Sequence, residues 1–360
     1  MICMGDPALV IEAGGVRVGL LALGYHNTHQ TSDPENVQGL ECISGIEAAR
    51  RYVPMLRHRS EVVVIVSHQG YQVDEMLARE VPGIDLIIGG HSHDLFEHPR
   101  LIGRTWIAQA LSDAAAPGEV RVSVVNGRIE EVTGTAHILW GDQLEPYGRM
   151  AGLIRKLREP YRQRLEEVIA TAIEWIDRQY KSESPFDKLV GGILREYAGA
   201  EVAFLPGLGY GISLHPGPVT REQLYTLLPH PANIVTLNLT GSQIMVILEQ
   251  SAANQAPQNP LDGVGGLIQT HGMRWTADLR QPAGQRIGHV FIGDAPLEPD
   301  RRYRVVTHSG MLAGIHGYSA FAEGSHVGED ELQITDLVEE RLRTMGRVYP
   351  PPLGDITLIK

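Results

Sequence analysis

The sequence predicts two layered domains, an α/β domain followed by an α+β domain. In the first part of the chain, apolar runs of strand length at 16–23, 62–66 and 84–88 alternate with helical spacing of apolar residues at 44–57 and 74–80. An alternation of strands and helices is typical of an α/β layer fold. The 360 residues leave room for a second domain at roughly 150 residues per domain.

The strands of the first domain are strongly apolar. The run VVVIV at 62–66 has no polar alternation, and VRVGLLAL at 16–23 is nearly as apolar, so both are expected to be buried strands of a parallel sheet. Further strands are expected at 105–108 and 120–125. The turn Asn126-Gly127 then predicts a hairpin, because this pair accepts the positive φ angles of a two-residue turn.

A charged segment follows the hairpin. Apolar residues recur at helical intervals over 145–169, and Pro160 is taken as a local interruption only. We therefore predict one long amphipathic helix within a linker at 141–170, which joins a domain at 1–140 to a domain at 171–360.

The second half mixes helices and strands without strict alternation. Helices are expected at 186–197, from Thr220 (as N-cap) to 227, and from 240 to about 253, and strands at 201–205 and 234–239. A polar loop rich in proline and glycine follows at 254–266. This pattern predicts an α+β domain.

Composition excludes several classes of protein. The formal net charge is −12, from 31 basic and 43 acidic residues, with no basic stripe, which argues against a nucleic-acid partner. No apolar run approaches the ~20 residues that span a bilayer, so no membrane segment is expected. The first ten residues do not have the pattern of a signal peptide, and two cysteines do not make a disulfide framework.

Three of the 15 histidines each follow a predicted buried strand. His68 lies in Ser-His-Gln-Gly after the second strand, and His91 and His93 lie in Gly-Gly-His-Ser-His-Asp after the third. Ligands of α/β sheets bind beyond the carboxyl ends of strands, and neutral imidazole is a good ligand for Zn and Mn. A lone histidine at such a place is more often an ordinary loop residue, but three together favour a metal site.

The stretch 62–99 resembles the end of the catalytic domain of the 5′-nucleotidase family of calcineurin-like metallophosphoesterases. The shared pattern is a strand with Ser-His-x-Gly, then Asp and Leu-Ala, then VPGIDLIIGGHSH. The second half resembles the C-terminal substrate domain of that family, in GAEVAFLPG, GPVTREQLYTLL, LNLTGSQIMVILEQSA and GIHGYSAF. The resemblance implies the C-terminal part of a metallophosphoesterase α/β sandwich, a linker helix and a 5′-nucleotidase C-terminal α+β domain.

The resemblance also implies chemistry. It predicts a phosphomonoester hydrolase with two divalent metal ions, Zn or Mn. His68 and His91 would bind one ion and His93 the other. Asp94 would orient an imidazole behind them, or else serve only as a turn residue.

The chain lacks the family's other metal motifs. No Asp-x-His, Gly-Asp-x-x-Asp or Gly-Asn-His-Glu occurs with the required spacing. Three imidazoles divided between two ions leave each ion short of ligands, so we expect weak metal affinity and little hydrolysis from these residues alone. The expectation is a catalytic domain truncated at its N-terminus, completed by a missing segment or a separately encoded fragment. The alternative is an inactive remnant that only binds a ligand.

The substrate domain departs from the purine-binding pattern of the family. Pro206 and Gly211 stand in place of an Asn and an Arg, and Leu267 and Gly310 in place of two phenylalanines that enclose the base. His316 replaces an Asp. A purine clamp is therefore not expected.

Three residues remain as candidates to bind a substrate. They are Asn233, Tyr210 and Tyr318, although Asn233 fits a turn equally well and either tyrosine fits the core equally well. The segment PGLGYGISLHPG resembles the sister branch of sulfur-oxidation thiosulfohydrolases, so a small phosphorylated molecule and a sulfur anion are both open as substrates. The resemblance also implies a periplasmic or extracellular location.

Overall fold

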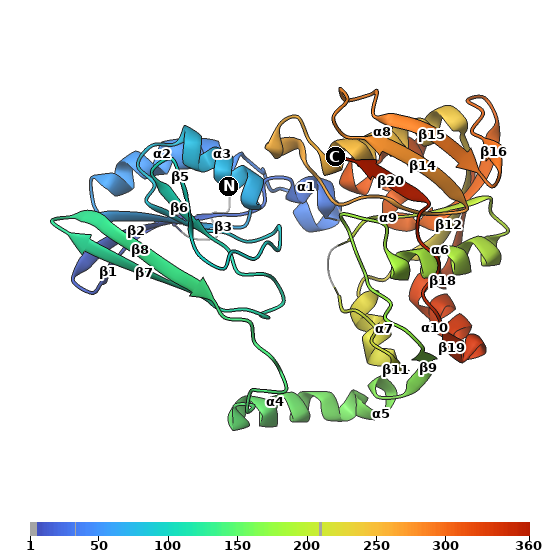
Figure 1. Ribbon diagram of the computed structural model, residues 1–360, viewed down its shortest axis with the longest axis horizontal. Coiled ribbons are helices and arrows are strands. Elements are labelled where there is room, and N and C mark those ends of the chain that lie inside the picture. Colours follow the sequence, from blue (N-terminus) through green and yellow to red (C-terminus); the bar gives the residue numbers. More distant parts are fainter. Residues whose placement is uncertain (1–5, 33, 209–210) are drawn as a thin grey trace. The chain divides into compact units, whose positions relative to one another are not determined.

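The computed structural model describes residues 6–32, 34–208 and 211–360. The chain divides into two compact units, the first made of Met1–His29 and Pro34–Tyr147 and the second of Gln30–Asp33 and Gly148–Lys360. Both units mix helices with sheets, which confirms the predicted mixed α/β class (Figure 1).

A six-stranded sheet forms the centre of the first unit. Its strand order is β1-β2-β3-β4-β6-β5. The four inner strands run parallel, and the two edge strands are antiparallel to their neighbours. The bounds are β1 (Ala8–Ala13), β2 (Val16–Leu23), β3 (Val62–Ser67), β4 (Leu86–Ile88), β5 (Arg100–Ile102) and β6 (Thr105–Ala108).

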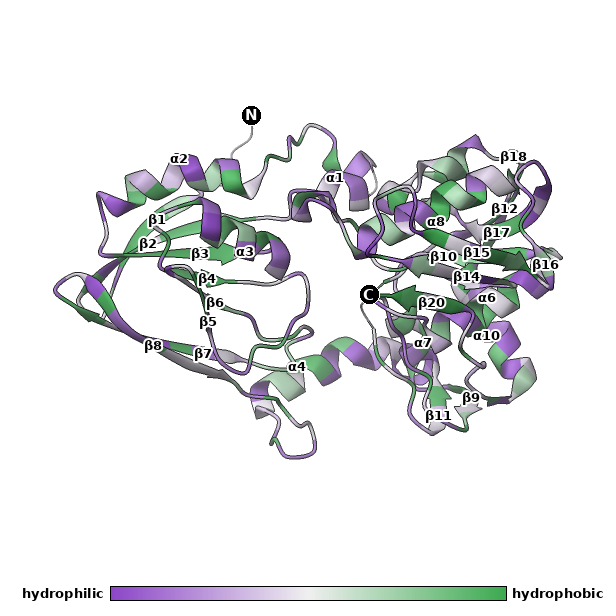
Figure 2. Cartoon of the chain, turned by 45° about the horizontal axis from the view of Figure 1, so that its top comes forward, coloured by the Kyte–Doolittle hydropathy of each residue, from purple (hydrophilic) through white to green (hydrophobic). Residues whose placement is uncertain are grey.

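Two helices, α2 (Gly45–Arg57) and α3 (Tyr71–Glu80), pack against one face of this sheet. On this face, the side chains of the inner strands are almost completely buried, among them Leu21, Ile65 and Ile87. Figure 2 shows the hydrophobic colour of β2 and β3. Ser44 begins α2 by accepting a hydrogen bond from the Ile46 N–H.

The opposite face of the sheet is apolar and is open toward the carboxyl end of β3. Val66 lies in the centre of the parallel sheet, yet 49% of it is exposed, and its neighbours Val64 and Leu20 are only half-buried. Parallel sheets are normally covered on both faces. On this face Val62 is 3% exposed, Val64 is half-buried and Val66 is exposed, so the expectation that the strand at 62–66 is fully buried is wrong toward its carboxyl end.

A hairpin follows the sheet. β7 (Gly118–Val125) pairs with β8 (Arg128–Ala136), and the turn residues Asn126 and Gly127 have φ values of 51° and 72°. Two positive φ angles are required by the favoured two-residue hairpin turn, so the predicted hairpin is confirmed.

Short helical turns lie before α2, at α1 (Thr28–Thr31) and Pro34–Val37.

The predicted long helix at 145–169 is interrupted. The chain forms α4 (Gly148–Arg158), a 3-10 turn at Glu159–Tyr161 and α5 (Arg162–Leu165), and then enters β9 (Val168–Ala172). Pro160 has no N–H to donate and its ring obstructs the preceding turn, which ends α4. The interruption at Pro160 is confined to Glu159–Tyr161, and the helical segment ends at Leu165, short of the predicted 169.

The second unit is built on a five-stranded sheet of order β13-β10-β17-β12-β18. Alternate residues of β10 serve two cores: Ala203 and Leu205 face one, and Val202 and Phe204 face the other. The five strands are β10 (Val202–Leu205), β12 (Asn233–Thr240), β13 (Gln269–His271), β17 (Arg302–His308) and β18 (Ser325–Gln333).

Two smaller sheets complete the second unit. One has the order β11-β9-β19 and the other β16-β15-β14-β20. Their remaining strands are β11 (Gly217–Thr220), β14 (Met273–Asp278), β15 (Ile287–Ile292), β16 (Ala295–Pro296), β19 (Arg347–Val348) and β20 (Ile356–Ile359).

Three helices of the second unit, which begin at Pro185, Arg221 and Gly241, start within one residue of the predicted positions. Thr220 and Thr240 each form a capping box with the glutamine three residues later, which satisfies two N–H groups at each helix start. The helices are α6 (Pro185–Ala198), α7 (Arg221–Leu227), α8 (Gly241–Gln255), α9 (Ser309–Leu312) and α10 (Ile334–Met345), with 3-10 turns at Pro260–Asp262, Ile315–Gly317 and Ser319–Glu323.

The difference in burial between the two faces of the sheet can be tested with two valines of β3, Val63 and Val66, one on each face. We expect Val63→Ala, at a fully buried position on the helix-covered face, to lower the free energy of unfolding by about 2–3 kcal/mol. Val66→Ala removes the same atoms from the open face and should cost under ~1 kcal/mol. Urea unfolding of both variants measures this. Equal losses would contradict the open face and mean that it is covered in solution.

Candidate functional site

The predicted histidines lie at the carboxyl edge of the six-stranded sheet. His68 directly follows β3, and His91 follows β4 by three residues. Because β3 and β4 are parallel neighbours, with Val66 opposite Ile88, their carboxyl ends meet at this edge. The sequence therefore places His68 and His91 correctly relative to the sheet.

The imidazoles of His68 and His91 face each other. Their ring centroids are 5.2 Å apart, and the ring planes meet at 66°. Burial, and to a lesser extent the charges of the neighbouring His68, His93 and His26, lower the pKa of His91 to about 4. His91 is therefore neutral at pH 7 and has a lone pair available for a cation.

Two further residues of this site were missed from the sequence. Tyr25 stacks on His91 with ring centroids 4.0 Å apart and 29° between the planes. The next residue, His26, is buried, and its ring forms an edge-type contact with Tyr25, with the ring centroids 5.3 Å apart. Both follow β2, which pairs in parallel with β3. The rule that selected His68, a histidine just after a buried strand, would have found His26 as well.

The backbone at the histidines is unusual. His91 and His93 have φ values of 77° and 56°, a region that non-glycine residues rarely occupy. The preceding glycines allow close packing: a Cβ at Gly89 would lie 2.6 Å from Asp74 Oδ2, and one at Gly90 would lie 3.2 Å from His68 Nδ1. Side chains at these two places would displace the groups beneath the site.

A buried carboxyl group lies under the histidine loops. Asp74 on α3 is fully buried, and its Oδ1 accepts a hydrogen bond of 2.5 Å from the Ser67 hydroxyl at the end of β3. Burial raises the pKa of Asp74 to about 7, although the hydrogen bond from Ser67 opposes this rise. Asp74 thus connects α3 to the residue directly before His68.

The donors fit part of a metal centre. Neutral imidazoles are suitable ligands for Zn and Mn, and two of them converge here. Over residues 6–32, 34–208 and 211–360, however, no group of three or more His, Cys, Asp or Glu side chains is arranged to hold a metal ion.

A family model for the 5′-nucleotidase C-terminal domain matches residues 168–323. This part of the chain is similar to the C-terminal domain of 5′-nucleotidases. The resemblance read from the sequence, with the sulfur-oxidation proteins as a sister branch, is confirmed by this match and by the relatives described next.

Relatives extend the similarity over nearly the whole chain. The trifunctional nucleotide phosphoesterase protein YfkN of Bacillus subtilis is 27% identical over 96% of this chain, which corresponds to 24% of that protein. A metallophosphoesterase of the same organism, YunD, is 26% identical over 63% of this chain and 49% of its own length. The chain thus spans half or less of these two curated relatives.

Solved structures show the same architecture. The sulfate thiohydrolase SoxB of Thermus thermophilus superposes with a TM-score of 0.89, at 25% identity, over 98% of this chain and 65% of that one. A 5′-nucleotidase precursor of the same organism superposes with a TM-score of 0.87, at 25% identity, over 98% of this chain and 74% of that one. The sulfate thiohydrolase and the 5′-nucleotidase precursor thus superpose on this chain about equally well.

The candidate substrate residues of the nucleotidase domain lie in ordinary structural positions. Asn233 begins β12, rather than lying in a loop, and its Nδ2 donates to Glu329 Oε1 at 2.9 Å. Tyr318 is 1% exposed, its hydroxyl donates to the Gly266 carbonyl at 3.4 Å, and burial raises its pKa to about 12. Tyr210 lies outside the described residues. Their role in binding a substrate stays a prediction, as does the orienting role of Asp94.

Two positions at which the sequence departs from the purine-binding pattern of the family hold buried side chains. Leu267 is completely buried in the core of the second unit, and His316 is buried with a φ of 57°.

None of the described helices is long and apolar enough to cross a membrane.

Asp74 gives the site a testable dependence on pH. Its carboxyl keeps a proton up to about pH 7 in the folded protein, whereas an unfolded aspartate loses it near pH 4. The folded state therefore binds more protons at Asp74 between these values, and this group's own contribution lowers the free energy of unfolding by a few kcal/mol as pH rises from about 4 to about 7, against the opposite contribution of buried histidines such as His91. Asp74→Asn should remove this fall.

Urea unfolding of the wild type and of Asp74→Asn at several pH values tests the assignment. Asp294→Asn, at a fully exposed aspartate, is the control and should leave the pH profile unchanged. If wild type and Asp74→Asn show parallel profiles between pH 4 and 7, the carboxyl group is ionised throughout and the assignment is wrong.

Proposed function

We propose that this chain supplies the histidine half of the dinuclear metal centre of a metal-dependent phosphoesterase of the 5′-nucleotidase family. The observation that carries the proposal is the convergence of His68 and His91 at the carboxyl edge of a parallel sheet, with centroids 5.2 Å apart. Homology to nucleotide phosphoesterases supports the reaction class.

In this proposal His68 and His91 hold one divalent ion, and His93 holds the second. When bound, divalent ions in such centres neutralise the charge of the ester and provide Lewis-acid chemistry. The chain itself contributes neutral donors, because burial keeps His91 unprotonated at pH 7. Tyr25 limits the movement of the His91 ring by stacking on it. Asp94 would fix the orientation of an imidazole.

The remaining ligands would come from polypeptide outside these 360 residues, either a preceding segment or a separate fragment. Three imidazoles cannot complete two coordination spheres, and centres of this class use carboxylate oxygens as well. The open apolar face of the sheet, at Val66, supports this part of the proposal, since a second layer would cover it. A remnant without catalysis is the alternative, in which neither ligands nor covering layer exist.

The substrate we propose is a small phosphorylated molecule bound with the help of the C-terminal domain. We place the protein in the periplasm or outside the cell, because one solved relative is described as a precursor, as exported proteins are before processing. A second candidate is thiosulfohydrolase-like hydrolysis of a sulfur anion, supported by the TM-score of 0.89 to the sulfate thiohydrolase.

Removal of one histidine tests the metal site. We expect His91→Ala to weaken Zn²⁺ or Mn²⁺ binding at least tenfold, because it removes one of two adjacent imidazoles. Isothermal titration of the metal-free protein measures affinity and stoichiometry. His58→Ala, at an exposed histidine at the end of α2, is the control and should bind as the wild type does. Unchanged affinity in His91→Ala would refute the ligand assignment.

Ligand binding separates the substrate candidates. We expect adenosine 5′-monophosphate to bind no more tightly than ribose 5-phosphate, because Leu267 and Gly310 offer no aromatic ring to the base. Such a ring contributes about 1–3 kcal/mol per stacked base in single-strand binders. A tenfold or greater preference for the nucleotide would contradict this. Tighter binding of an alkyl thiosulfonate than of either phosphate would favour the second candidate.

A further inference from the structure

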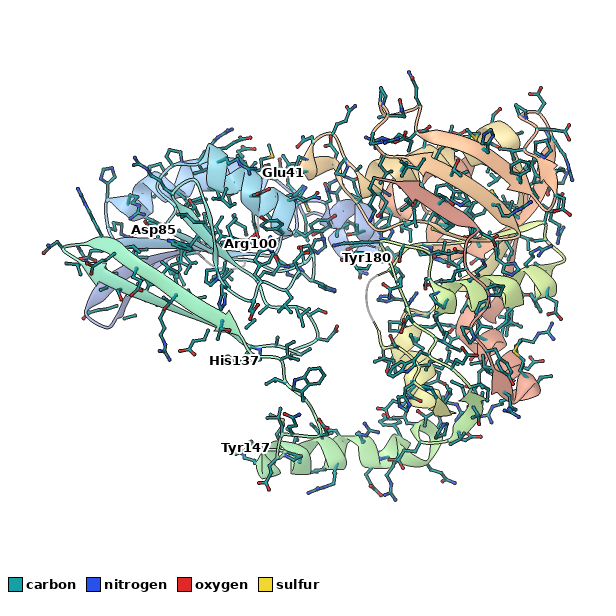
Figure 3. The ribbon with its side chains drawn as sticks, viewed as in Figure 1. Glu41, Asp85, Arg100, His137, Tyr147 and Tyr180 are labelled. Carbon is teal, nitrogen blue, oxygen red and sulfur yellow. The ribbon has the colours of Figure 1, made fainter. Side chains whose placement is uncertain are left out.

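Gln109 directly follows β6 and is 97% buried, with 3% of its surface exposed. Its backbone carbonyl accepts a hydrogen bond from the Phe96 N–H at 2.9 Å, and the Leu111 N–H donates to the Asp94 carbonyl at 3.0 Å. The guanidinium carbon of Arg100, labelled in Figure 3, lies 3.9 Å from the centre of the Phe96 ring. The chain that leaves the histidines thus returns alongside Gln109.

The side chain of Gln109 contacts the histidine loop itself. Its Oε1 accepts hydrogen bonds from the Asp94 N–H at 3.0 Å, the Ser92 hydroxyl at 3.0 Å and the His93 N–H at 3.2 Å. The amide is assigned this orientation because the reverse one would set its NH₂ against these donors. The Ser92 oxygen in turn accepts from the Tyr71 N–H at 2.9 Å, which joins the loop to the start of α3.

The loop needs such support. His91 and His93 both occupy the left-handed region, which persists in non-glycine residues only where the surroundings determine the backbone. The second terminal atom of the Gln109 amide lies against Gly89. A Cβ atom built on Gly89 would lie 3.2 Å from this amide atom and 2.6 Å from Asp74 Oδ2. Gln109 therefore packs against the loop on both sides of His91.

We propose that Gln109 is a positioning residue, whose amide oxygen fixes the backbone of residues 92–94 and thereby the direction of the His91 and His93 imidazoles. Its relevance to metal binding rests on the proposed function, whereas its hold on the loop does not. Gln109 would touch neither metal nor substrate and would act only through the two histidines.

Three variants separate this role from a general contribution to stability. Gln109→Met keeps the volume but removes the acceptor, and Gln109→Glu keeps an acceptor oxygen in the same place. The control is Gln269→Met, because Gln269 is 2% exposed and its Oε1 likewise accepts from a backbone N–H, that of Ser184 at 2.7 Å, but in the second unit.

Amide hydrogen exchange, followed by NMR, is the first readout and needs no metal. We expect the His93 and Asp94 N–H groups to exchange at least tenfold faster in Gln109→Met, near the wild-type rate in Gln109→Glu, and at the wild-type rate in Gln269→Met. Wild-type exchange of both groups in Gln109→Met would overturn the proposal. Should Gln109→Met not fold, Gln109→Asn withdraws the oxygen by shortening the side chain and is measured instead.

Zn²⁺ titration is the second readout. We expect at least a tenfold loss of affinity in Gln109→Met and less than a threefold change in Gln109→Glu. Equal affinity of Gln109→Met and the wild type would overturn the positioning role toward the metal. If the wild type itself binds no Zn²⁺, the proposed function fails, and amide exchange alone decides whether Gln109 holds the loop.

Discussion

The parallel pairing of β2, β3, β4 and β6 is the constraint on which the candidate site depends. Parallel strands bring their carboxyl ends to one edge, so residues separated by more than 80 positions meet there. His26 follows β2, His68 follows β3, His91 follows β4 and Gln109 follows β6. A change in the register of any of these strands would separate the imidazoles from each other or from the amide that supports them.

Polar groups are buried beneath this edge at a cost in free energy. A fully buried carboxyl group is unfavourable unless it is hydrogen-bonded or protonated, and Asp74 is bonded to Ser67 and has a raised pKa. Gln109 in turn satisfies three donors of the loop with one oxygen. These groups contribute little to the hydrophobic core, but they fix two strand ends relative to each other. We interpret them as the support of the histidines.

The sequence predicts the local features of this account well, because they depend on neighbouring residues. The apolar runs of β2 and β3, the turn at Asn126-Gly127 and the N-cap at Thr220 are all signalled within a few positions. The histidines after β3 and β4 follow from the same local pattern. The end of the linker helix is not predicted, because the apolar spacing continues to Val168, whereas the helical segment ends at Leu165 and Val168 begins β9.

Features that depend on distant contacts could not be predicted. Gln109 gains its role only because β6 pairs with β4, and nothing in the sequence near residue 109 indicates the loop at 92–94. The stacking of Tyr25 on His91 and the open side of β3 also arise only in the folded sheet. From the sequence alone, Tyr318 fits a substrate-binding role and a core position equally well. Its burial in the folded protein shows that it packs in the core.

The central claim is that His68, His91 and His93 act together as metal donors. Histidine side-chain NMR of the 360-residue chain during a Zn²⁺ titration tests it most directly, because every imidazole nitrogen is observed separately. The account predicts that nitrogens of these three residues shift together while histidines away from the sheet edge, such as His58 and His289, stay unchanged. Shifts confined to other histidines, or none at all, would contradict it.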